Sequence, residues 1–129
     1  MDFVSIRVIT GDVERMARFY EQATGRPVTR RTEDFAELVT PSATMAIAST
    51  RTIQMFGAGA AHQADNHSVI VEFRVEDVDA EYEKLKGLGC DMVLEPTTQP
   101  WGNRSLLFRD PDGNLVNFFT PASPAGRLS

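Results

Sequence analysis

Apolar and polar residues alternate at the start of the chain, and this alternation predicts a half-buried strand over residues 3–8. The pattern then changes, because apolar residues recur every three or four positions from Val13 to Ala23, the spacing of a helix with one buried face. Asp12 is placed to cap this helix or to act as an acid of its first turn, and Gly25 is placed to end it. Three short strands are expected next, over residues 28–31, 36–39 and 44–48.

The second half of the chain repeats this order of elements. Residues 69–75 predict a strand, Asp77 is placed to cap a helix with an apolar stripe, and Gly89 is placed to end it. Further strands are expected around residues 92–95, 104–108 and 115–119. Aligning the halves places Asp12 on Asp77, a repeat of about 65 residues, and such a duplication indicates a fold more strongly than any single element. It predicts an α+β fold of two βαβββ modules.

The length of the chain bounds the number of domains. A chain of 129 residues is long enough for one hydrophobic core and short for two conventional domains. We therefore expect a single domain over residues 1–129. Its expected parts are a first module over about 1–54, a linker over about 55–67, a second module over about 68–121 and a tail over 122–129.

Composition argues against several classes of protein. The net charge of −5 argues against a nucleic-acid partner, because phosphate binding needs clustered Lys and Arg. The sequence has no recognisable signal peptide and no apolar run near the ~20 residues of a membrane span, so we expect no membrane partner and a cytoplasmic location. Cys90 is the only cysteine, which excludes an internal disulfide, and no histidine is placed beside it as a base.

Residues 100–119 form the most informative stretch. They read as a loop, a strand, a tight turn over residues 110–114 (Asp-Pro-Asp-Gly-Asn) and a second strand, which is a β-hairpin. The same residue types in the same order resemble the last hairpin of the vicinal-oxygen-chelate superfamily, which includes glyoxalase I, the bleomycin-resistance proteins and the extradiol dioxygenases. The resemblance covers nearly the whole chain. It implies curved sheets around a cleft, and a homodimer with two ligand crevices.

The resemblance also locates the positions where metal-dependent relatives carry their ligands. The matching positions here are Phe3, Ile70, Asn117 and a residue within Thr44–Ser49. None of them is a histidine or a carboxylate, which are the side chains that hold a divalent ion at such a site. The resemblance is therefore to the metal-free members of the superfamily, and we expect no metal and no cofactor.

Glu72 is the most interesting acid, because it lies mid-strand on the face expected to look into the cleft. A buried carboxylate needs a partner, and a salt bridge to Arg7, Arg74 or Arg104 would provide one. Recognition of a ligand or proton transfer is the alternative role.

The two histidines lie in or beside the linker, and both His62 and His67 fit exposed loop positions. The alternative is that His67 enters the cleft as a ligand or a general base, which makes Glu72 and His67 weak catalytic candidates.

Trp101 offers a rigid flat surface for stacking an aromatic ligand, or it covers the core. Phe56 and Phe35 could join it, and Arg104 could clamp an anionic group or pair with Glu72. On the last strand we place Leu115, Asn117 and Phe119 inward. The predicted ligand-binding residues are Phe3, Ser5, Phe56, Ile70, Glu72, Trp101, Arg104, Asn117 and Phe119.

Three functions follow from this reading. The leading one is a metal-free binder of a small, partly aromatic molecule, such as an antibiotic or another aromatic metabolite that the protein sequesters. The second is a lyase, isomerase or dioxygenase-type enzyme of the same fold that uses acid–base residues or an off-site metal. The third is a protein-interaction subunit with a vestigial cleft. Nucleophile elbows and phosphate-binding glycine loops are absent from the sequence.

Overall fold

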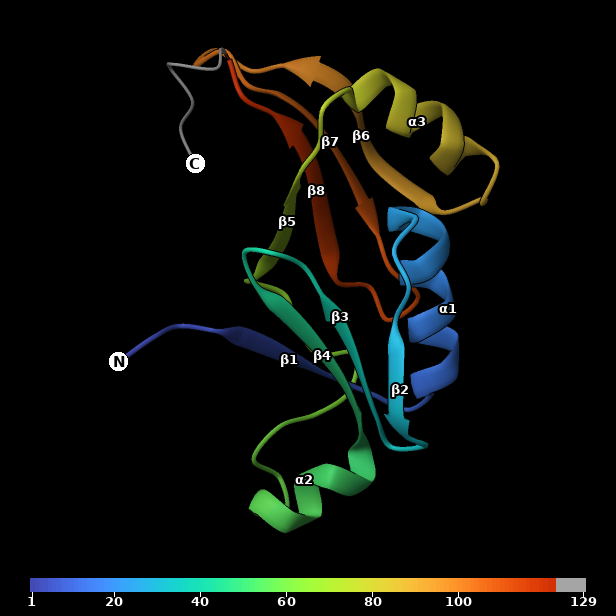
Figure 1. Cartoon of the computed structure of the whole chain (residues 1–129), viewed down its shortest axis with the longest axis vertical. Coiled ribbons are helices and arrows are strands. Elements are labelled where there is room, and N and C mark those ends of the chain that lie inside the picture. The colour runs from blue at the N-terminus through green and yellow to red at the C-terminus, as the bar shows by residue number, and fades with distance from the viewer. Residues whose placement is uncertain (123–129) are drawn as a thin grey trace. The chain divides into compact units, whose positions relative to one another are not determined.

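The first unit of the chain is a four-stranded sheet with a long helix on one face. The structure, a computed structural model, describes residues 1–122, and these form two units, Met1–Asn66 and the residues from His67 onwards, each described here by itself. Figure 1 labels the elements. In the first unit they are β1 (Ser5–Thr10), α1 (Val13–Thr24), β2 (Thr29–Thr32), β3 (Phe35–Val39), β4 (Thr44–Ser49) and α2 (Thr50–Phe56).

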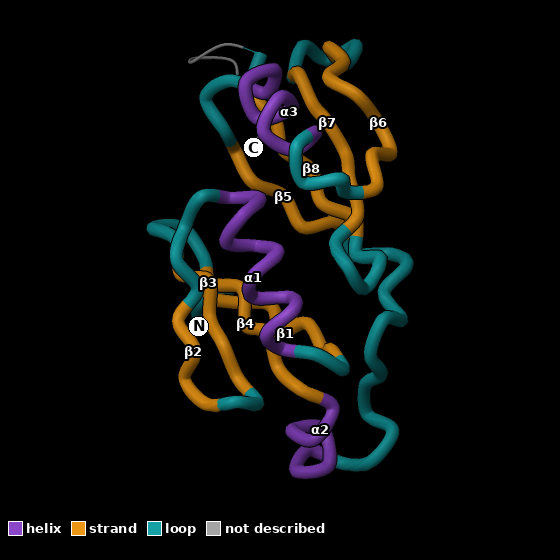
Figure 2. The backbone as a smooth tube through the Cα atoms, turned by 90° about the vertical axis from the view of Figure 1, so that its right-hand side faces the viewer, coloured by secondary structure: helices purple, strands orange, loops and turns teal. Residues whose placement is uncertain are grey.

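The strands of the first sheet lie in the order β1-β4-β3-β2. β1 runs parallel to β4, and the other pairs are antiparallel. The helix α1 packs on β3 and β4 (Figure 2), and its face toward the sheet buries Met16, Ala17 and Tyr20. Because strand side chains alternate, Leu38 and Ile47 are buried with this helix, while Arg7 and Phe35 belong to the opposite face.

The second unit repeats the plan. Its elements are β5 (Ile70–Arg74), α3 (Val78–Lys86), β6 (Asp91–Thr98), β7 (Arg104–Arg109) and β8 (Leu115–Thr120). The strand order is β5-β8-β7-β6, with β5 parallel to β8, and α3 packs on β6, β7 and β8. Phe118 lies in the core, with its ring centroid 5.6 Å from that of Phe73 and 5.0 Å from that of Phe108. The predicted α+β fold of two βαβββ modules is confirmed, with one addition, the helix α2.

Local signals placed the helix starts correctly. Asp12 accepts a hydrogen bond from the Arg15 amide, and Asp77 accepts one from the Ala80 amide, so both aspartates are N-caps. Gly25 ends α1 in the left-handed conformation (φ 71°). The end predicted for α3 is wrong: this helix stops at Lys86, and Gly89 lies beyond it in a turn.

The first strand begins later than predicted. β1 starts at Ser5, where its register with Thr44 of β4 starts. Phe3 and Val4 precede the strand and are 87% and 64% exposed, so neither belongs to the buried core. The reason is the partner strand: β4 begins at Thr44, whose amide donates to the Val4 carbonyl at 3.2 Å, and the ladder between the two strands ends there.

The helix α2 falls at the end of the predicted first module and at the start of the predicted linker, where no helix was expected. Its seven residues bury Thr52 and Ile53, and the Thr52 hydroxyl donates to the Ser49 carbonyl at 2.7 Å. A helix this short depends on packing rather than on its own propensity, which explains why its sequence carries little signal.

The predicted tail, 122–129, lies outside the described residues except for Ala122. None of the helices within residues 1–122 combines the length and hydropathy that a membrane span requires.

The turn of the predicted hairpin is organised by one buried carboxylate. Asp110 is 5% exposed, and its Oδ1 accepts from the amides of Asp112 and Asn114, both at 2.9 Å. Its Oδ2 accepts from the Asn114 side-chain amide at 2.8 Å. Gly113 has a φ of 85°, which favours glycine. These bonds join the end of β7 to the start of β8.

We predict that Asp110→Ala lowers the free energy of unfolding by about 3 kcal/mol, because it leaves several buried donors without an acceptor. Urea unfolding followed by circular dichroism measures the change. Asp91→Ala, at an exposed aspartate of the same unit, is the control and is expected to change stability by less than about 0.5 kcal/mol. Equal losses in the two variants would contradict the role given to the turn carboxylate.

Candidate functional site

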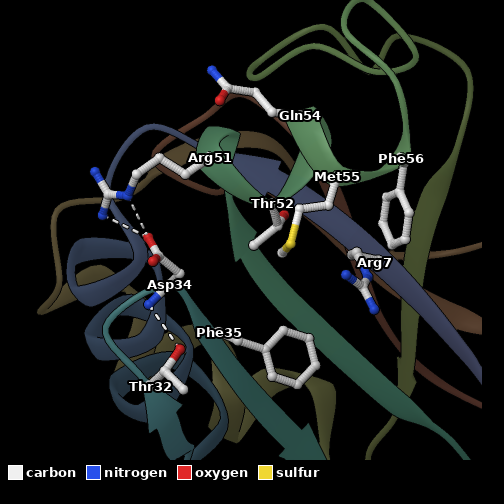
Figure 3. Close-up of a pocket in the computed structure, with 9 residues that line it drawn as sticks. All are labelled: Arg7, Thr32, Asp34, Phe35, Arg51, Thr52, Gln54, Met55 and Phe56. Carbon is white, nitrogen blue, oxygen red and sulfur yellow. Dashed lines mark hydrogen bonds and ion pairs between the residues drawn. The ribbon is translucent and has the colours of Figure 1, made fainter.

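A pocket of about 520 Å³ lies beside α2 in the first unit (Figure 3). Strands β1, β2 and β3 contribute one residue each, and the turn before β3 and the helix α2 contribute the others. The pocket is lined by Arg7, Thr32, Asp34, Phe35, Arg51, Thr52, Gln54, Met55 and Phe56. In Figure 3 the Met55 side chain points into the space between Phe35 and Phe56, whereas Gln54 points away from it.

Arg7 contacts both aromatic rings of the pocket. Its guanidinium carbon lies 5.1 Å from the ring centroid of Phe35 and 5.3 Å from that of Phe56. These are cation–π distances. Within the first unit, residues 1–66, no hydrogen-bond acceptor or carboxylate pairs with the Arg7 guanidinium. Arg7 therefore brings an unneutralised positive charge to an otherwise largely apolar wall.

The second arginine of the pocket is already neutralised. The Arg51 Nε donates to Asp34 Oδ1 at 2.8 Å, and the Ser49 hydroxyl donates to the same oxygen at 2.7 Å. The Arg51 hydrogen bond, followed by that of Ser49, holds the pKa of the Asp34 carboxyl below its usual value. Asp34 is thus a fixed carboxylate committed to Arg51.

Two of the predicted site residues in the second unit lie together. Glu72 and Asn117 are register partners on β5 and β8, and the Asn117 Nδ2 donates to Glu72 Oε2 at 2.9 Å. Ile70 and Phe119 lie on the same face, opposite the face that α3 covers, as the alternation predicted. Within the second unit neither Arg74 nor Arg104 is an ion-pair partner of Glu72. The amide of Asn117 satisfies this carboxylate in their place.

Arg104 pairs with Asp79 and not with Glu72 within the second unit. Its Nε donates to Asp79 Oδ2 and its Nη2 to Asp79 Oδ1, both at 2.9 Å, and its Nη1 donates to Thr98. Arg104 is the register partner of Thr120, whereas Ser105 pairs with Phe119 on the other face. Strand alternation therefore directs Arg104 toward α3, away from the face of Glu72. The Arg104 hydrogen bonds lower the pKa of the Asp79 carboxyl.

The remaining predicted site residues are distributed over both units. Phe56, at 65% exposed, lines the pocket, whereas Phe3, at 87% exposed, and Ser5 do not. Trp101 is 57% exposed in the loop between β6 and β7. His67 is exposed in the segment before β5.

Sequence patterns alone do not predict most of this pocket. Arg7 was expected only as a possible partner of Glu72, and Phe35 only as a neighbour of Trp101. Met55 and Arg51 carry no sequence signal for a site, because their contribution depends on the unpredicted helix α2. The alternation of Ser5 and Arg7 on one face was the signal that could have drawn attention to Arg7.

The donor set does not fit the divalent metal of the metal-dependent relatives. Within residues 1–122 no three His, Cys, Asp or Glu side chains come together as a possible metal site. On the inward face of β4 the side chains are Thr44, Ala46 and Ala48, which supply no strong ligand. Cys90 is half-buried, and burial raises the pKa of its thiol, so it is not a ready thiolate ligand.

Comparisons with known proteins agree with the fold. A family model described as Glyoxalase/Bleomycin resistance protein/Dioxygenase superfamily matches residues 2–118. The uncharacterised protein YraH of Bacillus subtilis (strain 168) is 25% identical, and the match covers 92% of this chain and 98% of YraH.

Solved structures give the same result. A glyoxalase/bleomycin resistance protein/dioxygenase family enzyme from Burkholderia phytofirmans PsJN superposes with a TM-score of 0.84 at 17% identity, covering 93% of this chain and 98% of that one. A glyoxalase-related enzyme from Fulvimarina pelagi superposes with a TM-score of 0.80 at 19% identity, covering 99% of this chain and 96% of that one. Such low identities show the fold alone.

We predict that Arg104→Gln weakens the pH dependence of stability. Pairing with Arg104 lowers the pKa of the Asp79 carboxyl in the folded protein below its ordinary value of 3.8. The pair therefore stabilises the protein above pH 3.8. This stabilisation is lost as the pH falls through the lowered pKa. The variant should be less stable than the wild type near neutral pH and nearly equal to it at about pH 2. Urea unfolding across this range measures the difference.

Arg109→Gln is the control, because Arg109 donates to the Gly113 carbonyl and not to a carboxylate. Its loss should change stability by a similar amount at every pH in this range. Identical pH profiles for Arg104→Gln and the wild type would rule out the effect assigned to the Asp79 pair.

Proposed function

The chain belongs to the Glyoxalase/Bleomycin resistance protein/Dioxygenase superfamily, and we propose that within it the protein binds a small, partly aromatic molecule without the help of a metal. An antibiotic or another aromatic metabolite would be the ligand, and sequestration would be the purpose. The observation that carries this proposal is the pocket beside α2, in which two phenylalanine rings and Met55 surround an arginine.

The dimensions and lining of the pocket support a small organic ligand. Its volume of about 520 Å³ lies within the range of sites for drug-sized molecules. Such sites are mostly apolar, with a few polar groups that orient the ligand. Phe35, Phe56 and Met55 supply apolar area, with each Å² buried contributing roughly 25 cal/mol before the costs of binding. The rings also allow edge-to-face or offset stacking with an aromatic ligand.

The donor set supports capture without a metal. The positions that match the ligands of metal-dependent relatives hold Phe3, Ile70 and Asn117, and no cluster of strong ligands occurs among the described residues. Shape, stacking and hydrogen bonding are then the means of recognition left to this chain.

The proposal also includes the polar pair of the second unit. Glu72 and Asn117 form a hydrogen-bonding group on the face that no helix of that unit covers, flanked by Ile70 and Phe119. We keep Phe3, Ser5 and Trp101 as further candidates for ligand contact. The homodimer expected from the family stays a prediction that sedimentation equilibrium would test.

We predict that the neutral fluorescent probe N-phenyl-1-naphthylamine binds in the pocket, with a blue shift and a rise in its emission. Phe56→Ala removes one of the two rings and should weaken probe binding about tenfold, equivalent to about 1.4 kcal/mol. Phe56→Tyr keeps the ring and should bind within about twofold of the wild type. Fluorescence titration measures each affinity.

Val93→Ala, which removes exposed apolar surface in the second unit, is the control and should leave probe binding unchanged. An unchanged affinity in Phe56→Ala would remove the pocket from the proposal. The proposal itself fails if the wild-type protein gives no emission change at any probe concentration.

We predict that the protein does not retain a stoichiometric transition metal. After equilibrium dialysis against Zn²⁺, Ni²⁺, Mn²⁺ or Fe²⁺, elemental analysis should find well below one equivalent, because the described residues offer no converging ligand set. EDTA should leave the affinity for N-phenyl-1-naphthylamine unchanged. One equivalent of tightly held metal would favour the lyase, isomerase or dioxygenase alternative.

A further inference from the structure

Arg7 and its surroundings indicate what kind of ligand the pocket takes. We infer that the ligand is an aromatic oxyanion, with a carboxylate as the model case, and that Arg7 binds its negative group while the phenylalanine rings contact its aromatic part. This inference rests on the proposed function and makes it more specific. Four properties of the first unit support it.

The first property is that the Arg7 side chain is held but its donors are unused. Phe35 and Phe56 contact its charge at 5.1 and 5.3 Å. Contacts with ring faces do not consume N–H donors, of which a guanidinium has five. None of these donors has an acceptor within the first unit, residues 1–66. The side chain is therefore positioned by the rings and is still able to donate.

The second property is the charge balance of the pocket lining. Two arginines and one acid line it, and the acid, Asp34, is bound by Arg51 and Ser49. The lining therefore has a net charge of +1, carried by Arg7. A cationic ligand would be repelled by this charge, whereas an anionic ligand would neutralise it.

The third property is that a neighbouring acid is also committed elsewhere. Glu37 lies on the same face as Arg7, separated from it across the sheet by Ala46 of β4. Its carboxylate accepts from the Arg31 Nε at 2.9 Å. Glu37 is therefore not the ion-pair partner of Arg7.

The fourth property is the match between guanidinium and oxyanion geometry. A planar guanidinium binds a carboxylate through two parallel hydrogen bonds, a geometry that an ammonium ion cannot provide. A flat aromatic acid would place its ring against Phe35 and Phe56 and its anion at Arg7.

The test compares three naphthalene probes of similar size by displacement of bound N-phenyl-1-naphthylamine. They are naphthalene-2-carboxylate, the neutral naphthalene-2-carboxamide and the cationic 2-(aminomethyl)naphthalene. The carboxylate should bind about 10- to 100-fold more tightly than the carboxamide, the range expected for charge-assisted hydrogen bonds. The amine should bind most weakly. Raising NaCl from about 50 to about 500 mM should weaken binding of the carboxylate and leave that of the carboxamide unchanged.

Arg7→Met keeps an unbranched apolar stem between the rings and removes the charge. It should lower carboxylate affinity about 10-fold or more and leave carboxamide affinity within about twofold. Arg18→Gln is the matched control, because it removes one arginine of the same unit from α1, where Arg18 pairs with Glu14. That variant should bind all three probes as the wild type does.

The outcomes separate this inference from the proposed function. If the wild-type protein binds carboxylate and carboxamide equally, or if Arg7→Met weakens both equally, the inference fails while an aromatic binding site stands. If neither the naphthalenes nor N-phenyl-1-naphthylamine binds, the proposed function fails, and the inference fails with it. The comparison of probes on the wild-type protein does not depend on how well Arg7→Met folds.

Discussion

The alternation of side chains along each strand is the constraint on which the rest of this protein depends. In both units one face of a four-stranded sheet is buried under a helix, and this burial commits every second residue to the core. Tyr20 of α1 is fully buried in the first unit, and Phe118 lies in the core of the second. The remaining residues are left for chemistry on the opposite face, where Arg7 and Glu72 are found.

The two units share a topology but differ in what their uncovered faces carry. The first unit presents a cation between two rings beside a cavity that α2 helps to form. The second presents the Glu72 carboxylate, which accepts a hydrogen bond from the Asn117 amide. Between the end of its last strand and residue 122 this unit has no helix that corresponds to α2. The two units therefore share the packing of a helix on a sheet and differ on their uncovered faces. This division is common where one fold supports many functions.

Ion pairs explain which charged residues are available to a ligand. Arg30 binds Glu14 and Glu21, Arg51 binds Asp34, and Arg104 binds Asp79. These surface ion pairs add little stability, but each gives its arginine a carboxylate partner. Arg7 differs from these three because aromatic rings, and not a carboxylate, accompany it. An arginine held in this way is stabilised without losing its capacity to bind an anion.

The sequence by itself determined the elements whose signals are local. Asp12 and Asp77 as caps, the turn over residues 110–114 and the repeated order of strands and helices depend on neighbouring residues, and the structure agrees with all of them. Tertiary structure decided what depends on residues far apart in the chain. The start of β4 determines where β1 begins. The position of α3 determines that Arg104 pairs with Asp79. The pocket around Arg7 depends on a short helix, α2, that packing stabilises. Local patterns specify backbone conformation, whereas a binding site requires side chains from several elements to meet, and that meeting is a property of the folded unit.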